Sequence, residues 1–112
     1  MYTDGRGVPQ DDEQAVHYYR LAADQGDPDG QVNLGVMYDN GRGVPQDDEQ
    51  AAHYYRLAAD QGHVTGQNNL GAMYNHGQGV PQDDEQAAHY YRLAADQGDA
   101  YAQDQLKEMG ID

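Results

Sequence analysis

Apolar and small residues recur along the chain at helical spacing, in blocks separated by polar, glycine-containing segments. In the middle of the chain, Ala51, Tyr54, Tyr55, Ala58 and Ala59 follow one another at i, i+3, i+4, i+7 and i+8. This spacing places all five on one face of a helix, which we name helix B. The small alanines let a second helix approach closely, and the tyrosines fill the space beside them. Polar residues occupy the other sides.

A second apolar stripe precedes helix B and predicts a partner helix, helix A. Gly30, Leu34, Met37 and Tyr38 lie on one side of it, and Gly35 lies next to them. The missing side chain of Gly35 also permits a close helix contact. The two stripes match one another, and they predict an antiparallel pair of helices that share one apolar layer.

Local signals mark the ends of helix A. Asp27 is typical of an N-cap, and Pro28 is typical of the first helical position, where its missing N–H costs nothing. Gly41 is suited to the left-handed conformation that ends many helices. We therefore expect helix A to run from Pro28 to Asn40.

Helix B has its own start and stop signals. Asp47 predicts the N-cap, and Gln50, three residues later, completes a capping-box pattern. The helix is expected to continue to about Gln61 and to stop at Gly62. Between the two helices, the run from Gly41 to Pro45 predicts a turn.

The pair of helices recurs every 36 residues. Residues 43–62 and 79–98 both read GVPQDDEQAAHYYRLAADQG, and residues 7–26 differ from them only at Val16. A pair this small cannot bury its stripe alone, so neighbouring pairs must stack into one continuous core. The sequence predicts an all-α solenoid in a single array. Its expected divisions are a partial repeat at 1–26, full repeats at 27–62 and 63–98, and a capping helix at 99–112.

The two ends of the array differ. Met1-Tyr2 corresponds in period to the end of a helix A whose body is absent, so Tyr18, Leu21 and Ala22 of the first helix B are expected to be partly uncovered. This open edge suggests that Met1 is an internal cut or a misassigned start. If the chain does begin at Met1, the open edge predicts weak self-association or marginal stability.

At the other end, Lys107 stands where the earlier repeats have a contact glycine. A charged residue there closes the stack, as expected of a terminal cap. This end is therefore expected to be a true end of the array.

The composition makes several classes of partner and site a poor fit for this chain. The 112 residues include 20 acidic and 6 basic side chains, a net charge of −14 that disfavours nucleic acid and anionic membranes as partners. The chain has no cysteine and therefore no disulfide or thiolate site. No signal peptide or membrane-spanning run is visible, which leaves the compartment open, with the cytoplasm as the default expectation.

Two recurring polar motifs are candidates for chemistry, and both have simpler explanations. Asp-Asp-Glu at 11–13, 47–49 and 83–85 could offer oxygen ligands to a cation, but acidic residues in a first helical turn also favour the helix dipole. Histidines recur at His17, His53 and His89, one per repeat, too far apart to share one ion and on the side away from the core. With no serine and only one lysine, we expect no catalytic residues, no metal and no cofactor.

One repeat resembles the Sel-1-like repeat, a relative of the tetratricopeptide repeat. The resemblance is carried by Leu34, Gly35, Tyr38, Gly41, Gly43, Val44, Asp47, Ala51, Tyr54, Tyr55, Ala58, Ala59 and Gly62, and again 36 residues later. It implies a right-handed superhelix of antiparallel helix pairs that serves as a non-enzymatic scaffold for other proteins, often in bacterial signalling, envelope or host-interaction settings.

The chain departs from the family pattern at two kinds of position. The family usually has Trp at Tyr18, Tyr54 and Tyr90, and Ala at Gly30 and Gly66, so both changes are expected to weaken packing or helix propensity. Some cysteine-rich members are associated with β-lactam binding. A β-lactam enzyme is therefore a remote alternative by family analogy, although this chain has no cysteine.

Copies of helix A differ from one another, whereas copies of helix B barely do. The differing positions of helix A span an arc of about 100°, which we expect to face away from the core. Either these exposed positions simply drift, or they bind a protein or peptide partner, because in tetratricopeptide-like solenoids the A helices line the concave face. The candidate partner-binding residues are Asp29, Val32, Val36, Asp39, Asn40, Thr65, Asn68, Ala72, Asn75 and His76. A structural fragment that self-associates through its open N-terminal edge is the alternative.

Overall fold

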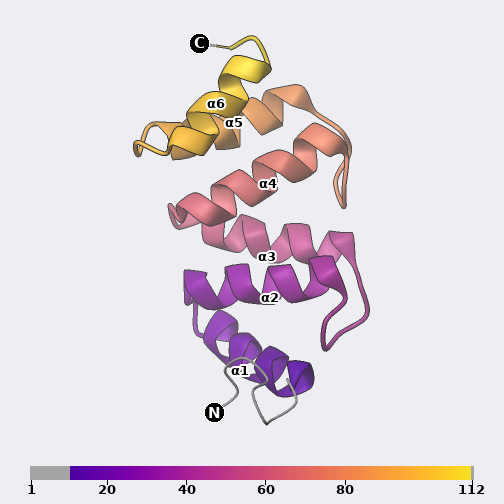
Figure 1. The fold of residues 1–112 in the computed structure, drawn as a ribbon. Coiled ribbons are helices and arrows are strands. Elements are labelled where there is room, and N and C mark those ends of the chain that lie inside the picture. Colours follow the sequence, from indigo (N-terminus) through magenta and orange to yellow (C-terminus); the bar gives the residue numbers. More distant parts are fainter. Residues whose placement is uncertain (1–10, 112) are drawn as a thin grey trace.

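The computed structural model describes residues 11–111, and in that part of the chain it contains six α-helices and no strand. The helices stack in chain order into a body of 47 × 27 × 27 Å (Figure 1). This arrangement confirms the predicted all-α solenoid. The B helices are α1 (Asp12–Asp24), α3 (Asp48–Asp60) and α5 (Asp84–Ala95), and the A helices are α2 (Pro28–Asn40), α4 (Val64–His76) and α6 (Ala100–Glu108).

The predicted ends of helix A are confirmed in α2. The side chain of Asp27 accepts a hydrogen bond from the backbone N–H of Asp29 at 3.2 Å. Gly41 adopts φ 66°, and its N–H donates to the carbonyl of Met37. A residue with a side chain would be strained in this conformation, which explains why the helix ends at a glycine.

The capping box predicted for helix B is only half formed. The side chain of Asp47 accepts from the N–H of Gln50 at 3.1 Å, as expected. The backbone N–H of Asp47 donates to the carbonyl of Tyr38 at 3.0 Å rather than to the Gln50 side chain. The start of α3 is therefore tied to the last turn of α2, and this tertiary bond replaces the second half of the box.

Two glycines hold helix A close to two different B helices. A Cβ added at Gly30 would lie 2.6 Å from the Cβ of Ala22 in α1, and one added at Gly35 would lie 2.7 Å from the ring of Tyr55 in α3. The missing Cβ at Gly30 therefore lets α1 and α2 approach one another, whatever the lower helix propensity of glycine costs at this position.

Buried glutamines join successive repeats. Gln31 is 4% exposed; its amide nitrogen donates to the carbonyl of Ala23 at 3.4 Å, and its amide oxygen accepts from Gln61 at 2.8 Å. The same pair of bonds recurs one repeat later around Gln67, at 3.3 and 3.0 Å. Each buried amide therefore has one partner on the helix B that precedes its helix A and one at the end of the helix B that follows it.

Arginine and tyrosine form a second link between repeats. Arg56 of α3 donates to the hydroxyl of Tyr74 at 2.6 Å and to that of Tyr90 at 3.2 Å. The two tyrosine rings stack with centroids 6.0 Å apart and planes 3° apart. In the preceding repeat Arg20 donates to the hydroxyl of Tyr38 at 3.0 Å. The guanidinium thus spans from one repeat to the next.

The first helix B is partly uncovered, as predicted. Tyr18 is 57% exposed, whereas its counterpart Tyr90 is 7% exposed. Ala22 is half-buried, whereas its counterpart Ala58 is fully buried. Met1 and Tyr2, which carried the argument for a truncated helix A, lie outside the described residues.

The outer face of the B helices is the same in every repeat. Leu21 is exposed, but the end of the array is not the reason, because the leucines one and two repeats later are exposed as well. The predicted row of exposed histidines is confirmed. The residues on this face include His17, Leu21, His53, Leu57, His89 and Leu93.

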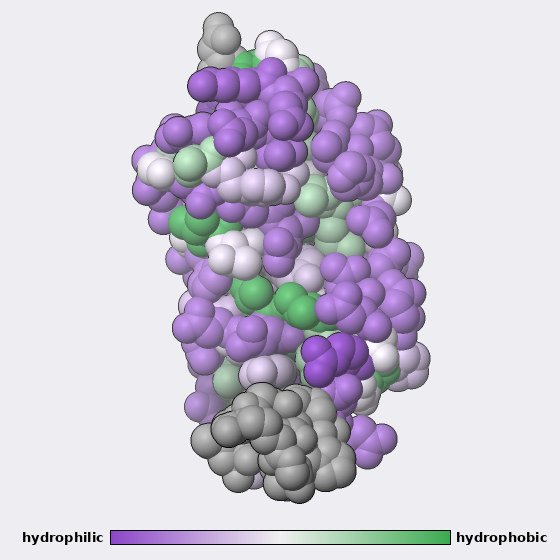
Figure 2. Space-filling view, in the orientation of Figure 1, coloured by the Kyte–Doolittle hydropathy of each residue, from purple (hydrophilic) through white to green (hydrophobic). Residues whose placement is uncertain are grey.

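Polar side chains cover most of the molecular face drawn in Figure 2, and the apolar ones gather only in small separate patches. None of the helices between residues 11 and 111 has both the length and the apolar composition needed to cross a bilayer.

Candidate partner-binding surface

The residues predicted to bind a partner lie along α2 and α4. At the same 36-residue spacing, Tyr101, Asp104 and Glu108 lie on α6, the third helix A, and Ile111 follows the end of that helix; the last equivalent position lies outside the described residues. We name the ten predicted residues together with these four the A-helix strip. It follows the three A helices in order along the stack.

The strip does not lie wholly opposite the core, and that part of the prediction is wrong. Val32 is 7% exposed and belongs to the main buried cluster, against which Val36 also packs. The physical reason is that α2 contacts α4 directly, so part of this face is enclosed at the junction between two A helices. Asp29, Asn40, Thr65 and His76 are exposed as expected.

A hydrogen bond between His63 and Asp29 spans the α2–α4 junction. The Nε2 atom of His63 lies 2.7 Å from the Oδ1 atom of Asp29, and its Nδ1 atom accepts from the backbone N–H of Gly66 at 3.3 Å, which caps α4. Since Nδ1 is the acceptor, the ring proton lies on Nε2 and is donated to the carboxylate. Beside the pair is a cavity of about 370 Å³ lined by Asp29, Val32, Asn33, His63 and Thr65.

The α4–α6 junction has different chemistry at equivalent positions. Asn68, the counterpart of Val32, donates from Nδ2 to the Oδ2 atom of Asp99 at 2.9 Å. The same carboxylate oxygen accepts from the N–H of Ala102 and so caps α6. The Oδ1 atom of Asn68 is buried and has no hydrogen-bond partner among the described residues. One junction therefore buries a valine, and the other is joined through an amide.

Asp39 connects the strip to the core. Its Oδ2 atom accepts from the hydroxyl of Tyr55 at 3.4 Å. Burial, together with the charge of Asp48, raises the pKa of the Asp39 carboxyl above its usual value, and the hydrogen bond from Tyr55 opposes that shift only in part. The counterpart on α4, Asn75, carries no charge.

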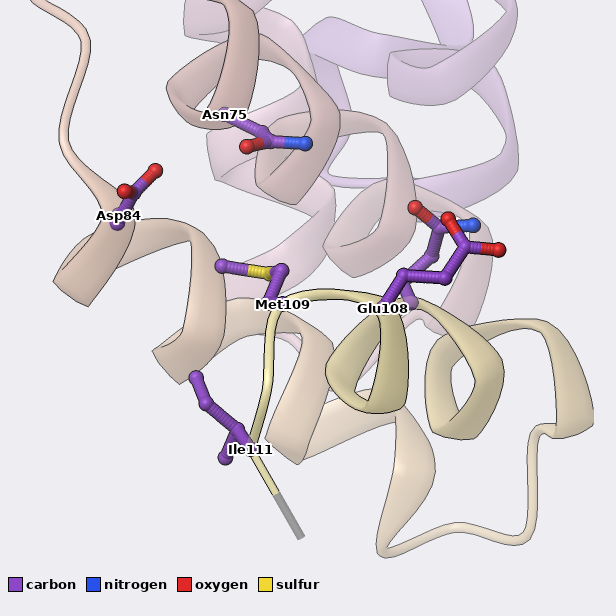
Figure 3. Close-up of a pocket in the computed structure, with 6 residues that line it drawn as sticks. Asn75, Asp84, Glu108, Met109 and Ile111 are labelled. Carbon is purple, nitrogen blue, oxygen red and sulfur yellow. The ribbon is translucent and has the colours of Figure 1, made fainter.

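A second cavity, of about 350 Å³, lies where α4, α5 and α6 meet. Figure 3 shows Met109 between the carboxylates of Asp84 and Glu108, with Asn75 on the α4 side. The two acids and the apolar side chains suit a cation on an alkyl stem, such as lysine or arginine. The lining residues are Asn75, Asp84, Gln105, Glu108, Met109 and Ile111.

Sequence reasoning missed the share of the strip that lies on α6. Tyr101 is 52% exposed and occupies the position of Asp29 and Thr65. The signal was available, because the 36-residue period extends to this helix. The third helix A is hard to recognise because the sequence identity between repeats ends after the second copy.

The recurring acidic triplets fall at the starts of B helices. Asp12 and Glu13 lie in the first turn of α1, and the equivalent residues lie in the first turns of α3 and α5. Between residues 11 and 111, no three His, Asp or Glu side chains converge in an arrangement that could hold a metal ion.

The 36-residue unit itself can be compared with known families. The sequence pattern of the Sel1 repeat matches residues 1–27, 28–63 and 64–99. This chain belongs to the Sel1 repeat family. Sel1 repeat proteins are generally non-enzymatic scaffolds that mediate protein–protein interactions.

Solved Sel1-like repeat structures are similar to this one. The crystal structure of c5321, a protective antigen present in uropathogenic Escherichia coli strains, is 45% identical with a TM-score of 0.90 over 95% of this chain. A Sel1 repeat protein from Oxalobacter formigenes is 36% identical with a TM-score of 0.82 over 88% of the chain. Helicobacter pylori cysteine rich protein B is 28% identical with the same TM-score over 86%.

This Sel1 repeat chain is shorter than the proteins it resembles. It spans 23% of the Escherichia coli structure, 40% of the Oxalobacter structure and 72% of the Helicobacter structure. The Helicobacter protein is named for its cysteines, whereas this chain has none. A comparison with curated proteins finds no match.

Proposed function

We propose that this chain is a non-enzymatic protein-binding module that holds a protein or peptide segment along the A-helix strip. The observation that carries the proposal is the contrast between two outer surfaces. Positions on the strip differ between repeats, whereas outer positions of helix B such as Gln50, His53 and Asp60 recur unchanged in all three copies. Side chains that bind an irregular partner must differ along the array, and solvated positions have no such requirement.

The charge of the strip indicates the chemistry of the partner. Asp29, Asp39, Asp104 and Glu108 lie on it, and no lysine or arginine does. A segment rich in lysine or arginine fits this surface by charge complementarity, and the acidic net charge of the chain would speed its approach. The cavity between Asp84 and Glu108 would take one cationic side chain of that segment.

The non-enzymatic part of the proposal rests on composition. The chain has no cysteine or serine, and Lys107 is its single lysine, which removes most choices of nucleophile. We further propose that the partial repeat, the two full repeats and the C-terminal helix act as one array, with α6 as its cap.

The test is affinity capture from extract of the source cells with two charge-matched variants. Asp104→Lys with Glu108→Lys reverses two exposed charges on the strip, and Asp24→Lys with Asp60→Lys reverses two exposed charges on the B helices. Exposed sites are chosen because Val32 and Val36 support the core, so changing them would confound binding with folding. Circular dichroism must first show equal helicity.

The expected result is a protein captured by the wild type and by the helix B variant but lost with the strip variant. Its affinity should fall as salt is raised, because charge complementarity is screened. Equal capture by all three proteins, or loss only with the helix B variant, would refute the site. Capture that increases with salt would refute the basic character of the partner.

A further inference from the structure

The N-caps of the three A helices are chemically unequal. α2 and α6 follow aspartates, Asp27 and Asp99, whose carboxylates accept from backbone N–H groups. α4 follows His63, whose ring nitrogen Nδ1 accepts from the N–H of Gly66 at 3.3 Å. Aspartate is ordinarily ionised at neutral pH, whereas histidine is the side chain that ordinarily changes charge between about pH 5 and 8. The middle helix A therefore has a cap that a proton can remove.

Protonation of His63 removes this cap whichever way the ring is turned. A neutral imidazole has one nitrogen that donates and one that accepts, but an imidazolium has two donors and no acceptor. The N–H of Gly66 then loses its partner in the ring. A positive charge also stands at the N-terminus of α4, where the helix dipole disfavours it, and the first turn of α4 has no acidic residue to offset it. This turn should therefore loosen.

The second bond of the ring crosses to α2, and protonation changes its charge. The Nε2 atom of His63 lies 2.7 Å from the Oδ1 atom of Asp29, and this nitrogen carries a hydrogen in both states of the ring. A neutral ring leaves the negative charge of the carboxylate in place. An imidazolium cancels that charge while the bond across the junction is kept.

The charge at this junction is set by His63 and Asp29 together. Among the described residues, Asp29 is the one carboxylate paired with the ring. Asp60, at the end of α3, is exposed, and Asp27, at the start of α2, accepts from the N–H of Asp29. The residues that line the adjacent cavity include no lysine or arginine. The net charge of the pair is therefore −1 with a neutral ring and zero with a protonated one.

The pair adjoins the A-helix strip at a place that a partner can reach. The side chain of Asp29 is 78% exposed, and its Oδ2 atom is not used by His63. The cavity of about 370 Å³ beside it is lined in part by Val32 and Thr65. An ammonium group at Oδ2 with its alkyl stem against the valine fits this arrangement. All of these residues belong to α2, α4 and the turn before α4, inside the array.

We propose that His63 is a proton switch for the α2–α4 part of the A-helix strip. With a neutral ring, α4 is capped and Asp29 offers its charge to a lysine or arginine of the bound segment. With a protonated ring, the cap is lost and the charge is cancelled, so the segment is released at mildly acidic pH. The release rests on the proposed function of the strip, whereas the change at the cap does not.

Nuclear magnetic resonance of the free protein, between about pH 5.5 and 8, tests the cap. The amide proton of Gly66 should move upfield as the ring of His63 takes up its proton, because a hydrogen bond is lost. The amide of Ala102 is the internal control, since its cap is the carboxylate of Asp99. His63→Asn should abolish the shift and keep α4 capped, because asparagine is a good N-cap and does not titrate. His53→Asn, on the exposed face of helix B, should leave the shift unchanged.

Hexalysine tests the release, because its own charge is constant over this range of pH. Every protein in this test carries His76→Asn, since His76 is exposed on the strip and would add a pH dependence of its own. The amide shifts of Asp29 and Thr65 report binding at constant ionic strength. Between about pH 8 and 5.5 the affinity should fall by roughly two- to fivefold, the effect of one exposed charge pair. With His63→Asn the fall should be much smaller.

The outcomes separate the switch from the proposed function. A Gly66 amide that does not follow the protonation of His63 would overturn the switch. An equal loss of hexalysine affinity with and without His63 would overturn the release. If hexalysine binds at no pH, the basic character of the partner is refuted and the release with it. A Gly66 amide that still follows His63 would then support the proton-sensitive cap alone.

Discussion

The two sides of the A helices obey different rules. On the side packed against the B helices, α2 and α4 carry the same residues, among them Gly30 and Gly66, Leu34 and Leu70. On the strip side, the same backbone positions build a histidine–aspartate hydrogen bond and a buried valine at one junction and an amide link at the next. The packing side must fit two nearly identical B helices in every repeat. The strip side need only fit its own junction, which leaves it free to vary.

The largest effect on stability is expected at the buried part of the strip, where the two junctions differ most. Val32→Asn should lower the free energy of unfolding by about 2–3 kcal/mol, because it removes apolar burial and places an amide in the core cluster. The reciprocal change Asn68→Val should cost less than about 1 kcal/mol, since the bond lost to Asp99 is offset by removal of an unpaired oxygen. Urea unfolding measures both; equal costs would contradict the difference between the junctions.

On the packing side, Gly30→Ala should be destabilising although alanine is the better helix former. The new Cβ would lie 2.6 Å from the Cβ of Ala22, and forced separation of the helices costs about 1–3 kcal/mol, against a propensity gain of about 1 kcal/mol. The expected net loss is about 1–2 kcal/mol. Asn40→Ala, on the exposed strip, serves as the control and should change stability by less than about 0.5 kcal/mol. A more stable Gly30→Ala protein would show that the helices separate freely.

A third test compares arginines at two equivalent positions whose surroundings differ. Arg56→Ala should cost about 1 kcal/mol, because it removes hydrogen bonds to two tyrosine hydroxyls across a repeat interface. Arg92→Ala, at the same position on α5 but with an exposed side chain, should leave the stability unchanged within error. Thermal unfolding compares the two variants. Equal effects would mean that the arginine acts within its own helix.

The smallest effect is expected at Asp39. Folding raises the pKa of this carboxyl, so the folded state holds the proton more tightly than the unfolded state. Its stabilising contribution is therefore present at low pH and is lost as the pH rises through the folded pKa. Asp39→Asn, which copies the residue at position 75, should make the protein slightly more stable at neutral pH and reduce this pH dependence. Melting curves between pH 3 and 7 measure the change; a less stable variant at pH 7 would contradict it.

Local signals predicted the helices well, because the groups that end a helix lie within a few residues of it. Asp27, Gly41 and Asp47 do in the structure what their residue types suggest. The links between repeats could not be predicted in the same way. Gln31 is polar, which suggests exposure, yet it is buried, and its amide oxygen accepts a hydrogen bond from Gln61, which lies thirty residues away in the sequence.

The candidate surface was predicted in outline only. The 36-residue period located the varying positions, and most of them are exposed or half-buried. The burial of Val32 depends on how closely α2 and α4 approach one another. This distance cannot be predicted from the residue pattern of one helix alone. Even an identical local sequence does not determine burial, since Arg56 and Arg92 lie in the same repeated 20-residue run and differ in burial.

Every interface in the array uses the same parts at the same offsets, which bears on how such genes change length. An in-frame deletion of residues 27–62 would bring α1 against α4. Gly66 would then pack on Ala22 in place of Ala58, and Arg20 would reach Tyr74 in place of Tyr38. Because the 20-residue run at 43–62 is repeated letter for letter at 79–98, recombination between the copies would gain or lose a whole repeat. The protein would become longer or shorter, and each helix–helix interface would still be made by the same residue types.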